Sequence, residues 1–148
     1  QKLARRVCDK CKTIRKTNDY EKNIFKTVLN KDVEEICTPN LKGCSECSHG
    51  YIGRIAILEV LLTNEDIKDA IINGCSKDEL RKLVYTSDVV TLIEDGLSKV
   101  IDGETTFEEI MKIIDIENDL EIFEETKDAS SNMDKKVKEK ETIETLEF

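Results

Sequence analysis

The sequence predicts an α+β fold, in which a small cysteine-containing subdomain with a short strand or hairpin precedes a bundle of about four helices. Two Cys-x-x-Cys pairs lie within the first 47 residues, and a short run rich in β-branched and aliphatic residues follows the second pair. Beyond this run, typical capping residues recur ahead of segments with a helical spacing of apolar residues. We therefore expect the cysteine-containing subdomain at 1–62, the helices at 63–123, and a charged, disordered acidic tail at 124–148.

The charge of the chain differs between its two parts. The 148 residues are 37% charged and 39% hydrophobic, and the net charge is −9. Residues 1–62 contain 12 basic and 8 acidic residues, a net charge of +4, whereas the remainder contains 11 basic and 24 acidic residues, a net charge of −13. The two parts are therefore expected to face different partners. No apolar stretch is long enough for a transmembrane segment.

The two Cys-x-x-Cys pairs form the clearest motif of the sequence; they are Cys8 with Cys11 and Cys44 with Cys47. In such a turn both sulfur atoms point the same way, at a separation that suits the edge of a tetrahedron. Two turns brought together therefore complete a four-thiolate zinc site. Gly43 and Gly50 allow the backbone to turn tightly around the second pair. Because four thiolates leave no position for water, we expect a structural rather than a catalytic zinc ion.

Three further residues could take part in the chemistry of this region. Cys37 and Cys75 could be spare ligands or redox partners, although free cysteine more often behaves as a small buried apolar residue. His49, the only histidine, could replace a thiolate in a Cys3His site, but a complete set of four cysteines does not require it. A dithiol oxidoreductase is an alternative, which would need one reactive Cys-x-x-Cys pair at a helix start.

The segments around the second cysteine pair are predicted to be a helix and a strand. The 32 residues between the pairs are expected to contain a helix at 19–30. Residues 53–62, GRIAILEVLL, have the composition of a strand that is buried on both faces. Arg54 and Glu59 are separated by five, an odd number, so in a regular strand they project to opposite sides. Each of them needs a partner of its own.

Four helices are expected after this strand, at about 63–74, 76–85 and 88–102, followed by a fourth that begins after residue 105. The predicted caps of the first, second and fourth helices, each with an acidic residue three positions later, are Thr63, Ser76 and Thr105. Gly96 is expected to weaken the third helix and Gly103 to end it. In the fourth helix the residues expected to face inward are Phe107, Ile110, Met111 and Ile114.

Three stretches resemble, in order, the C-terminal region of the GspE/PilB-type secretion ATPases; they are QKLARRVCDKCK, GCSECSHGYIGRIAILEVL and TLIEDGLSKVIDGETTFEEIMKII. These ATPases are the hexameric motors of type II secretion and type IV pilus assembly. The resemblance covers residues 1 to about 115. It implies that the four paired cysteines are the zinc ligands of the family's metal subdomain. It also implies that the following helices pack on the RecA-like core of the same or a neighbouring subunit.

The nucleotide site of such a motor is not expected in this chain. Phosphate binding needs G-x-x-x-x-G-K-[ST], and the sequence contains no GK dipeptide. The chain also begins at Gln1 rather than Met, which suggests that an upstream region is missing. The resemblance implies that ATP and magnesium bind in that region. Subunit motion there would act on an inner-membrane platform protein, with the present segment as a zinc-stiffened appendage that transmits it.

The resemblance also bears on the charged residues, the location and the alternatives. Possible subunit-interface charges are Arg54, Arg5 and Arg6, which could equally be solvated surface residues. The implied location is the cytoplasm, peripheral to the inner membrane through partners.

A freestanding zinc module that binds nucleic acid or protein is the main alternative. The acidic net charge and the scarcity of aromatic residues argue against nucleic acid. Secretion, pilus assembly and DNA uptake remain open as the parent system.

Overall fold

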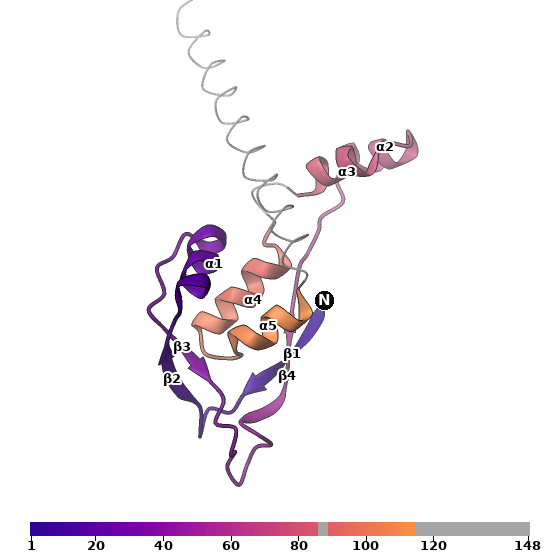
Figure 1. Cartoon of the computed structure of the whole chain (residues 1–148). Coiled ribbons are helices and arrows are strands. Elements are labelled where there is room, and N and C mark those ends of the chain that lie inside the picture. Colours follow the sequence, from indigo (N-terminus) through magenta and orange to yellow (C-terminus); the bar gives the residue numbers. More distant parts are fainter. Residues whose placement is uncertain (86–88, 115–148) are drawn as a thin grey trace, which may run out of the picture. The chain divides into compact units, whose positions relative to one another are not determined.

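The computed structural model describes residues 1–85 and 89–114 (Figure 1). In order, the elements of these residues are β1 (Lys2–Val7), β2 (Thr13–Lys16), α1 (Asp19–Leu29), β3 (Glu35–Thr38), β4 (Tyr51–Ile57), α2 (Glu65–Ile72), α3 (Lys77–Val84), α4 (Leu92–Ile101) and α5 (Phe107–Ile113). Helices and small sheets together confirm the α+β class. The predicted tail at 124–148 lies outside the described residues.

Two small antiparallel sheets organise the cysteine-containing part of the chain. β1 pairs with β4, so that Arg5 lies opposite Arg54, and the register shifts between Arg5 and Val7. β2 pairs with β3 in a second two-stranded sheet. β1 leads into the first cysteine pair and β4 follows the second, as can be followed in Figure 1. Pairing of β1 with β4 therefore brings together two motifs that are distant in the sequence.

The structure divides into two compact units. The first unit contains Gln1–Glu59 and the segment that begins at Val90; the second contains Val60–Val89. α4 and α5 thus belong with the strands, whereas α2 and α3 pair with each other. The expected helices are present, and they are divided between the two units. The boundary predicted between residues 62 and 63 concerns independent folding and stays a prediction.

The core of the first unit is built by α1, α4, α5 and one face of the strands. Its buried apolar residues are Ala4, Val7, Cys8, Ile24, Phe25, Val28, Ile36, Ile57, Ile93, Leu97, Val100, Phe107, Ile110 and Ile114. Gly96 has a packing role here, because a Cβ atom at this position would lie 3.0 Å from Cγ2 of the buried Ile110. The residue expected to weaken α4 therefore allows α5 to approach it closely.

Two predicted helices are confirmed, and the starts of three others are corrected. α1 matches the helix expected at 19–30, and α3 begins with the predicted capping box of Ser76 and Glu79. α2 is capped by Asn64 rather than by the residue before it. α4 begins at Leu92 rather than near 88, because Thr91 forms a capping box with the glutamate three positions later.

α5 begins one residue later than predicted, and its start has a different chemistry. Thr106 is the N-cap residue and makes no side-chain capping hydrogen bond. The hydroxyl of Thr105, the predicted cap, instead donates to the carbonyl oxygen of Arg5, at 2.8 Å. Both threonines are fully buried. A tertiary contact with β1 has therefore taken the place of the local cap.

The strand predicted at 53–62 is displaced and is not buried on both faces. β4 spans Tyr51–Ile57, and within it only Ile57 is buried. The apolar run that follows lies outside the strand, and Val60 and Leu62 are 67% and 83% exposed. Because a sheet of only two strands has few neighbours that could cover its second face, this segment is less buried than its apolar composition predicted.

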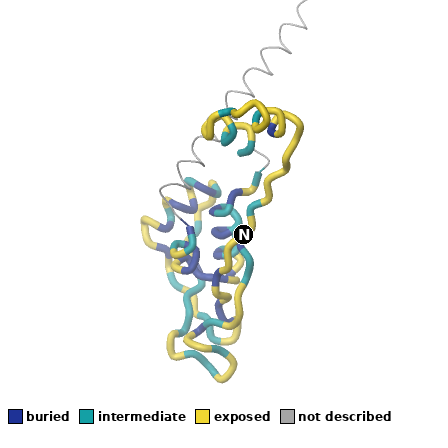
Figure 2. Tube along the Cα trace, turned by 90° about the vertical axis from the view of Figure 1, so that its right-hand side faces the viewer, coloured by how far each residue is buried: buried dark blue, intermediate teal, exposed yellow. Residues whose placement is uncertain are grey.

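The second unit has almost no core in its described part. α2 and α3 are eight residues each, and Ile67 is the one buried residue within these two helices. Figure 2 colours this hairpin mainly as exposed or intermediate. Among residues 1–85 and 89–114, no helix has both the length and the apolar character needed to cross a bilayer.

Candidate metal centre

The four predicted ligands lie together at one end of the two sheets. The sulfur of Cys8 lies 3.8 Å from that of Cys44, and the sulfur of Cys47 lies 3.5 Å from both Cys11 and Cys44. All four sulfur atoms are within 4.8 Å of one another. A zinc ion with Zn–S bonds of about 2.3 Å places its tetrahedral sulfur ligands roughly 3.8 Å apart. The cluster therefore has the donor set and the size that a tetrahedral metal ion requires.

Tight turns present both cysteine pairs. The backbone N–H of Cys11 donates to the carbonyl oxygen of Cys8 at 3.3 Å, and that of Cys47 donates to Cys44 at 3.4 Å. The N–H of Cys44 also donates to the sulfur of Cys47 at 3.2 Å. Gly43 precedes the second turn with φ of 73°, a left-handed conformation that glycine adopts without steric cost. The Gly residue before the second pair therefore serves the turn as predicted.

A second glycine joins the two cysteine turns. The N–H of Cys8 donates to the carbonyl oxygen of Gly50 at 2.8 Å. Gly50 has φ of 82°, and a Cβ atom there would lie 2.8 Å from backbone atoms of Asn40 and from the side chain of Pro39. No other residue fits this position without movement of the backbone. The glycine after the second pair thus holds the two turns at a fixed separation.

The environment of the sulfur atoms affects their ionisation unequally. Burial raises the pKa of the Cys11 thiol to about 12, and hydrogen bonds with the neighbouring cysteines act in the same direction. Burial also opposes ionisation of Cys47, but hydrogen bonds from the backbone of Cys44 and from the Cys11 and Cys44 thiols outweigh it and lower its pKa to about 7. Since metal ligation requires thiolates, binding at this site releases protons.

The remaining cysteines and the histidine lie outside the four-sulfur cluster. Cys37 is a half-buried residue of β3, and Cys75 lies between α2 and α3. Neither belongs to the group of potential ligands found among the described residues. His49 adopts a positive φ of 52°, and its Nδ1 lies 3.1 Å from the hydroxyl of Ser48. It is a neighbour of the cluster rather than a member of it.

The first cysteine turn is bonded to the connection between α4 and α5. The Lys12 ammonium donates to the carbonyl oxygen of Gly103 at 2.9 Å and pairs with Asp9 at 2.7 Å. At the end of β1, the N–H of Val7 donates to the carbonyl oxygen of Glu104 at 2.9 Å. A rearrangement of the cluster would therefore act directly on this helical connection.

An ion pair between β1 and α5 strengthens the same junction. Two nitrogens of the Arg5 guanidinium contact the two carboxylate oxygens of Glu109, at 2.9 and 2.6 Å. The Glu109 side chain is 7% exposed and that of Arg5 is 48% exposed. Hydrogen bonding from Arg5 outweighs burial and lowers the pKa of Glu109 to about 2. The Arg5 guanidinium also lies 3.9 Å from the ring centre of Tyr51, a cation–π contact.

A second arginine connects three elements. The guanidinium of Arg15 in β2 contacts the buried carboxylate of Glu21 in α1 at 2.6 and 2.8 Å, and that of Glu108 in α5 at 2.7 Å. No motif of the sequence identifies Arg15 or its partners. The only sequence signal is that both glutamates lie in the first turn of a helix, and this does not identify a cation distant in the chain.

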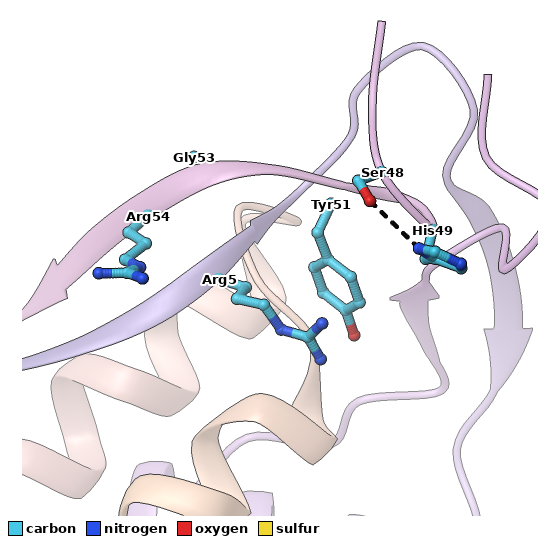
Figure 3. A pocket seen from close by; sticks show the side chains of 6 residues that line it. All are labelled: Arg5, Ser48, His49, Tyr51, Gly53 and Arg54. Carbon is cyan, nitrogen blue, oxygen red and sulfur yellow. Dashed lines mark hydrogen bonds between the residues drawn. The ribbon is translucent and has the colours of Figure 1, made fainter. Parts of the chain in front are cut away.

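The three arginines considered as interface residues have different surroundings. Arg5 forms the internal ion pair, and Arg6 pairs with Asp9 at 2.9 Å on the surface. Arg54 is exposed, and its side chain has no hydrogen bond or ion pair within the described part of the chain. With Arg5 and four other residues it lines a pocket of about 350 Å³ (Figure 3). Of the three arginines, Arg54 is thus the one whose charge has no partner among residues 1–85 and 89–114.

Comparison with known proteins gives a consistent assignment. Residues 1–112 match the family described as "Type II/IV secretion system protein". Over 120 residues and 75% of the chain, the sequence is 36% identical to the type IV pilus assembly ATPase PilB of Thermus thermophilus. It is 35% identical over 112 residues to the PilB of Myxococcus xanthus, and 33% identical over 114 residues to a putative type II secretion system protein E of Escherichia coli.

These matches cover 75% or 76% of the present chain but only 12%, 20% and 22% of the three relatives, respectively. The chain therefore spans less than a quarter of the length of each. The matched residues 1–112 include both cysteine pairs and nearly all of α4 and α5. The similarity thus extends over the four-cysteine cluster and over the two helices whose connection is bonded to it.

Proposed function

We propose a function for this chain from the premise that it belongs to the family of type II/IV secretion system proteins. In this proposal it forms the zinc-stabilised subdomain and helical appendage of a hexameric ATPase of type II secretion or type IV pilus assembly. ATP and magnesium bind in another part of that motor. The observation that carries the proposal is that the cysteine cluster, its flanking strands and α4–α5 pack as one unit within the matched region.

Zinc is the metal that suits the cluster best. The donor set consists of four cysteine sulfurs with no carboxylate or imidazole among them. Soft thiolate ligands in a tetrahedral arrangement select zinc or an iron–sulfur centre, and sulfur separations of 3.5 to 3.8 Å suit a single ion. The ligands proposed are Cys8, Cys11, Cys44 and Cys47. The ion has a structural role, since four protein ligands leave no site for substrate.

The proposed mechanical role rests on the bonds between the cluster and the helices. Lys12 joins the first cysteine turn to Gly103, and Arg5 joins β1 to Glu109. Gly96 allows close contact between α4 and α5. A unit with such short connections moves as a rigid body, and the metal keeps its loops from absorbing the motion. It is suited to transmit a displacement generated by ATP hydrolysis elsewhere.

The proposed partner is the RecA-like ATPase core of the same or a neighbouring subunit. Large apolar side chains of the second unit are exposed before α2 and on it; they are Val60, Leu61, Leu62, Ile71 and Ile72. An apolar surface of this kind is typical of an interface. Most of each relative's length lies outside the aligned region, which leaves room for such a core. The inner-membrane platform protein is reached indirectly, so the region acts in the cytoplasm at the membrane periphery.

A freestanding module that binds nucleic acid is the alternative, and the ion pairs argue against it. Seven of the 12 basic residues of the first 62 are engaged in ion pairs; they are Arg5, Arg6, Lys10, Lys12, Arg15, Lys22 and Lys26. Binding to phosphates requires cations that are free to replace counterions. The positive charge of this region is therefore largely used within the fold.

An assay of phosphate release tests the proposal. The chain alone, a RecA-like secretion ATPase subunit without this region, and their mixture are compared in magnesium-containing buffer. We expect no turnover by the chain alone and an increase in the turnover of the ATPase subunit on mixing. C44S is expected to abolish the increase, whereas C75S, outside the cluster, retains it. Turnover by the chain alone, or a mixture that behaves as the sum of its parts, would contradict the proposed role.

A further inference from the structure

We propose that the pocket beside β1 and β4 binds the carboxylate of an acidic segment of a protein partner through Arg54. The pocket, of about 350 Å³, is lined by Arg5, Ser48, His49, Tyr51, Gly53 and Arg54. It lies wholly within the first unit. The inference does not depend on the proposed motor role, since it concerns only the residues of this surface.

The register of the sheet places two positive charges opposite each other. Arg5 in β1 is the direct antiparallel neighbour of Arg54 in β4. Like charges in directly opposed positions of a sheet destabilise it. Figure 3 shows the guanidinium of Arg5 beside the ring of Tyr51 and that of Arg54 turned away from it along its own strand. The two charges therefore avoid each other, and each requires a separate anion.

Only one of these two charges is neutralised within the described structure. Glu109 accepts two hydrogen bonds from the Arg5 guanidinium, and Tyr51 covers a face of that group. The Arg54 side chain has neither an ion pair nor a hydrogen bond with residues 1–85 or 89–114, and the residue is exposed. Its planar guanidinium can donate two parallel hydrogen bonds to a carboxylate. The pocket thus offers one unused bidentate donor next to an arginine that is already satisfied.

The surroundings of Arg54 favour a protein carboxylate over a free phosphate ion. Leu3, two positions before Arg5 in β1, lies on the same face as the two arginines by the alternation of the strand, and it is 52% exposed. Arginine, tyrosine and exposed aliphatic side chains together are typical of protein interfaces. A phosphate ion would use the charge but not the apolar rim. An acidic side chain flanked by apolar residues would use both.

Binding of a defined peptide to the full-length, metal-loaded chain tests this inference. The probe is an acetylated, amidated peptide with the sequence Leu-Glu-Leu-Glu-Leu-Glu, titrated at low salt. NMR follows the side-chain Nε–H signal of Arg54 in the wild type, and the backbone amide signals of the other pocket residues give the affinity of every variant. We expect a saturable shift of the Nε–H signal and at least a tenfold loss of affinity in R54A. R54K keeps the charge but not the bidentate geometry, and we expect at least a fivefold loss.

K31A is the matched control, because Lys31 is an exposed cation of the same unit without an ion pair in the described structure, and it lies outside the pocket. We expect less than a twofold change in K31A. Equal losses in R54A and K31A would overturn the inference, since they would reveal only non-specific attraction. Full affinity in R54K would overturn the bidentate geometry. If inorganic phosphate at matched ionic strength saturates the Arg54 signal and the peptide does not bind, the inference is wrong and the ligand is a free oxyanion.

Discussion

The two units of this chain differ in what holds them together. The first unit has a continuous apolar core, two sheets, a four-sulfur cluster and ion pairs between residues about 100 positions apart. In its described part, the second unit has two short helices with local caps and one buried residue, Ile67. Local signals are therefore sufficient to form a helix, but burial and long-range bonds are what make a stable unit. The following substitutions test this difference, from the largest expected effect to the smallest.

Removal of one of the four paired cysteines should have the largest effect, and it should affect the first unit but not the second. We expect C44S to lose the metal and to unfold β1, β4, α4 and α5 together, because the α4–α5 connection is bonded to the first cysteine turn through Lys12. Metal binding contributes on the order of 10 kcal/mol to folding in zinc-finger peptides. Hydrogen exchange of α2 and α3 should not change. C75S is the control, and retention of protected α4 and α5 amides in C44S would show that they do not depend on the cluster.

Loss of the buried ion pair should destabilise the first unit less. E109Q removes the charge that Arg5 neutralises while it keeps the volume of the side chain. Breaking a fully buried pair costs about 3–5 kcal/mol, and because Arg5 is half-exposed we expect about 2 kcal/mol. Urea unfolding measures the loss. E65Q breaks the exposed pair of α2 with Lys68 and should change stability by less than about 0.5 kcal/mol. Equal effects would contradict the contrast between the units.

The effect of E109Q should also depend on pH. The pKa of Glu109 is lowered to about 2 in the folded chain, from about 4.3 in an unfolded one. A lowered pKa stabilises the fold above the unfolded value, and this contribution is lost as the pH falls towards the folded value. The difference in unfolding free energy between wild type and E109Q should therefore be equal at pH 6 and pH 5 and begin to shrink near pH 4. A decrease already between pH 6 and pH 5 would exclude this assignment.

A methyl group at Gly96 should show how tightly α4 and α5 are packed. The added Cβ would meet Ile110 at 3.0 and 3.2 Å, and Ile110 is fully buried. Alanine favours a helix by about 1 kcal/mol over glycine, but overpacking costs about 1–3 kcal/mol. We expect a net loss of about 1 kcal/mol in thermal unfolding. A stabilised G96A would show that α5 can move away and that the core is less rigid than proposed.

Equivalent capping boxes in the two units should respond differently. T91A removes the cap of α4 in the first unit, and S76A removes the cap of α3 in the second. Each cap contributes about 1 kcal/mol. We expect T91A to lower the stability of the whole first unit, whereas S76A should only speed hydrogen exchange within α3. A common decrease in the main thermal transition would indicate that the two units unfold together.

The sequence predicted those features that short spacing determines. Cys-x-x-Cys turns and the capping box of Ser76 depend on residues three positions apart, so their geometry follows from the local chain. The helix at 19–30 was also predicted, from the length of the segment between the cysteine pairs, and the structure adds its local capping box at Asn18. The α+β class and the family resemblance depended on the same local patterns and were confirmed.

The features that were missed depend on distant parts of the chain. An apolar stripe on α4 indicates that the helix is buried but not which partner covers it, so its packing with α1 and the strands was not predicted. The ion pairs of Arg5 and Arg15 with α5 join residues more than 90 positions apart. The role of Gly96 likewise becomes visible only when Ile110 is placed beside it. Spacing in the sequence contains none of this information.

The most direct test of the central claim compares the full-length chain before and after removal of its metal. The claim is that the four-cysteine cluster and α4–α5 form one metal-dependent unit. Elemental analysis should find one zinc ion per chain. After chelation, hydrogen exchange should rise together in β1, β4, α4 and α5, and return on addition of zinc, while α2 and α3 stay unchanged. Absence of bound metal, or a rise confined to the cysteine turns with α4 and α5 still protected, would contradict the claim.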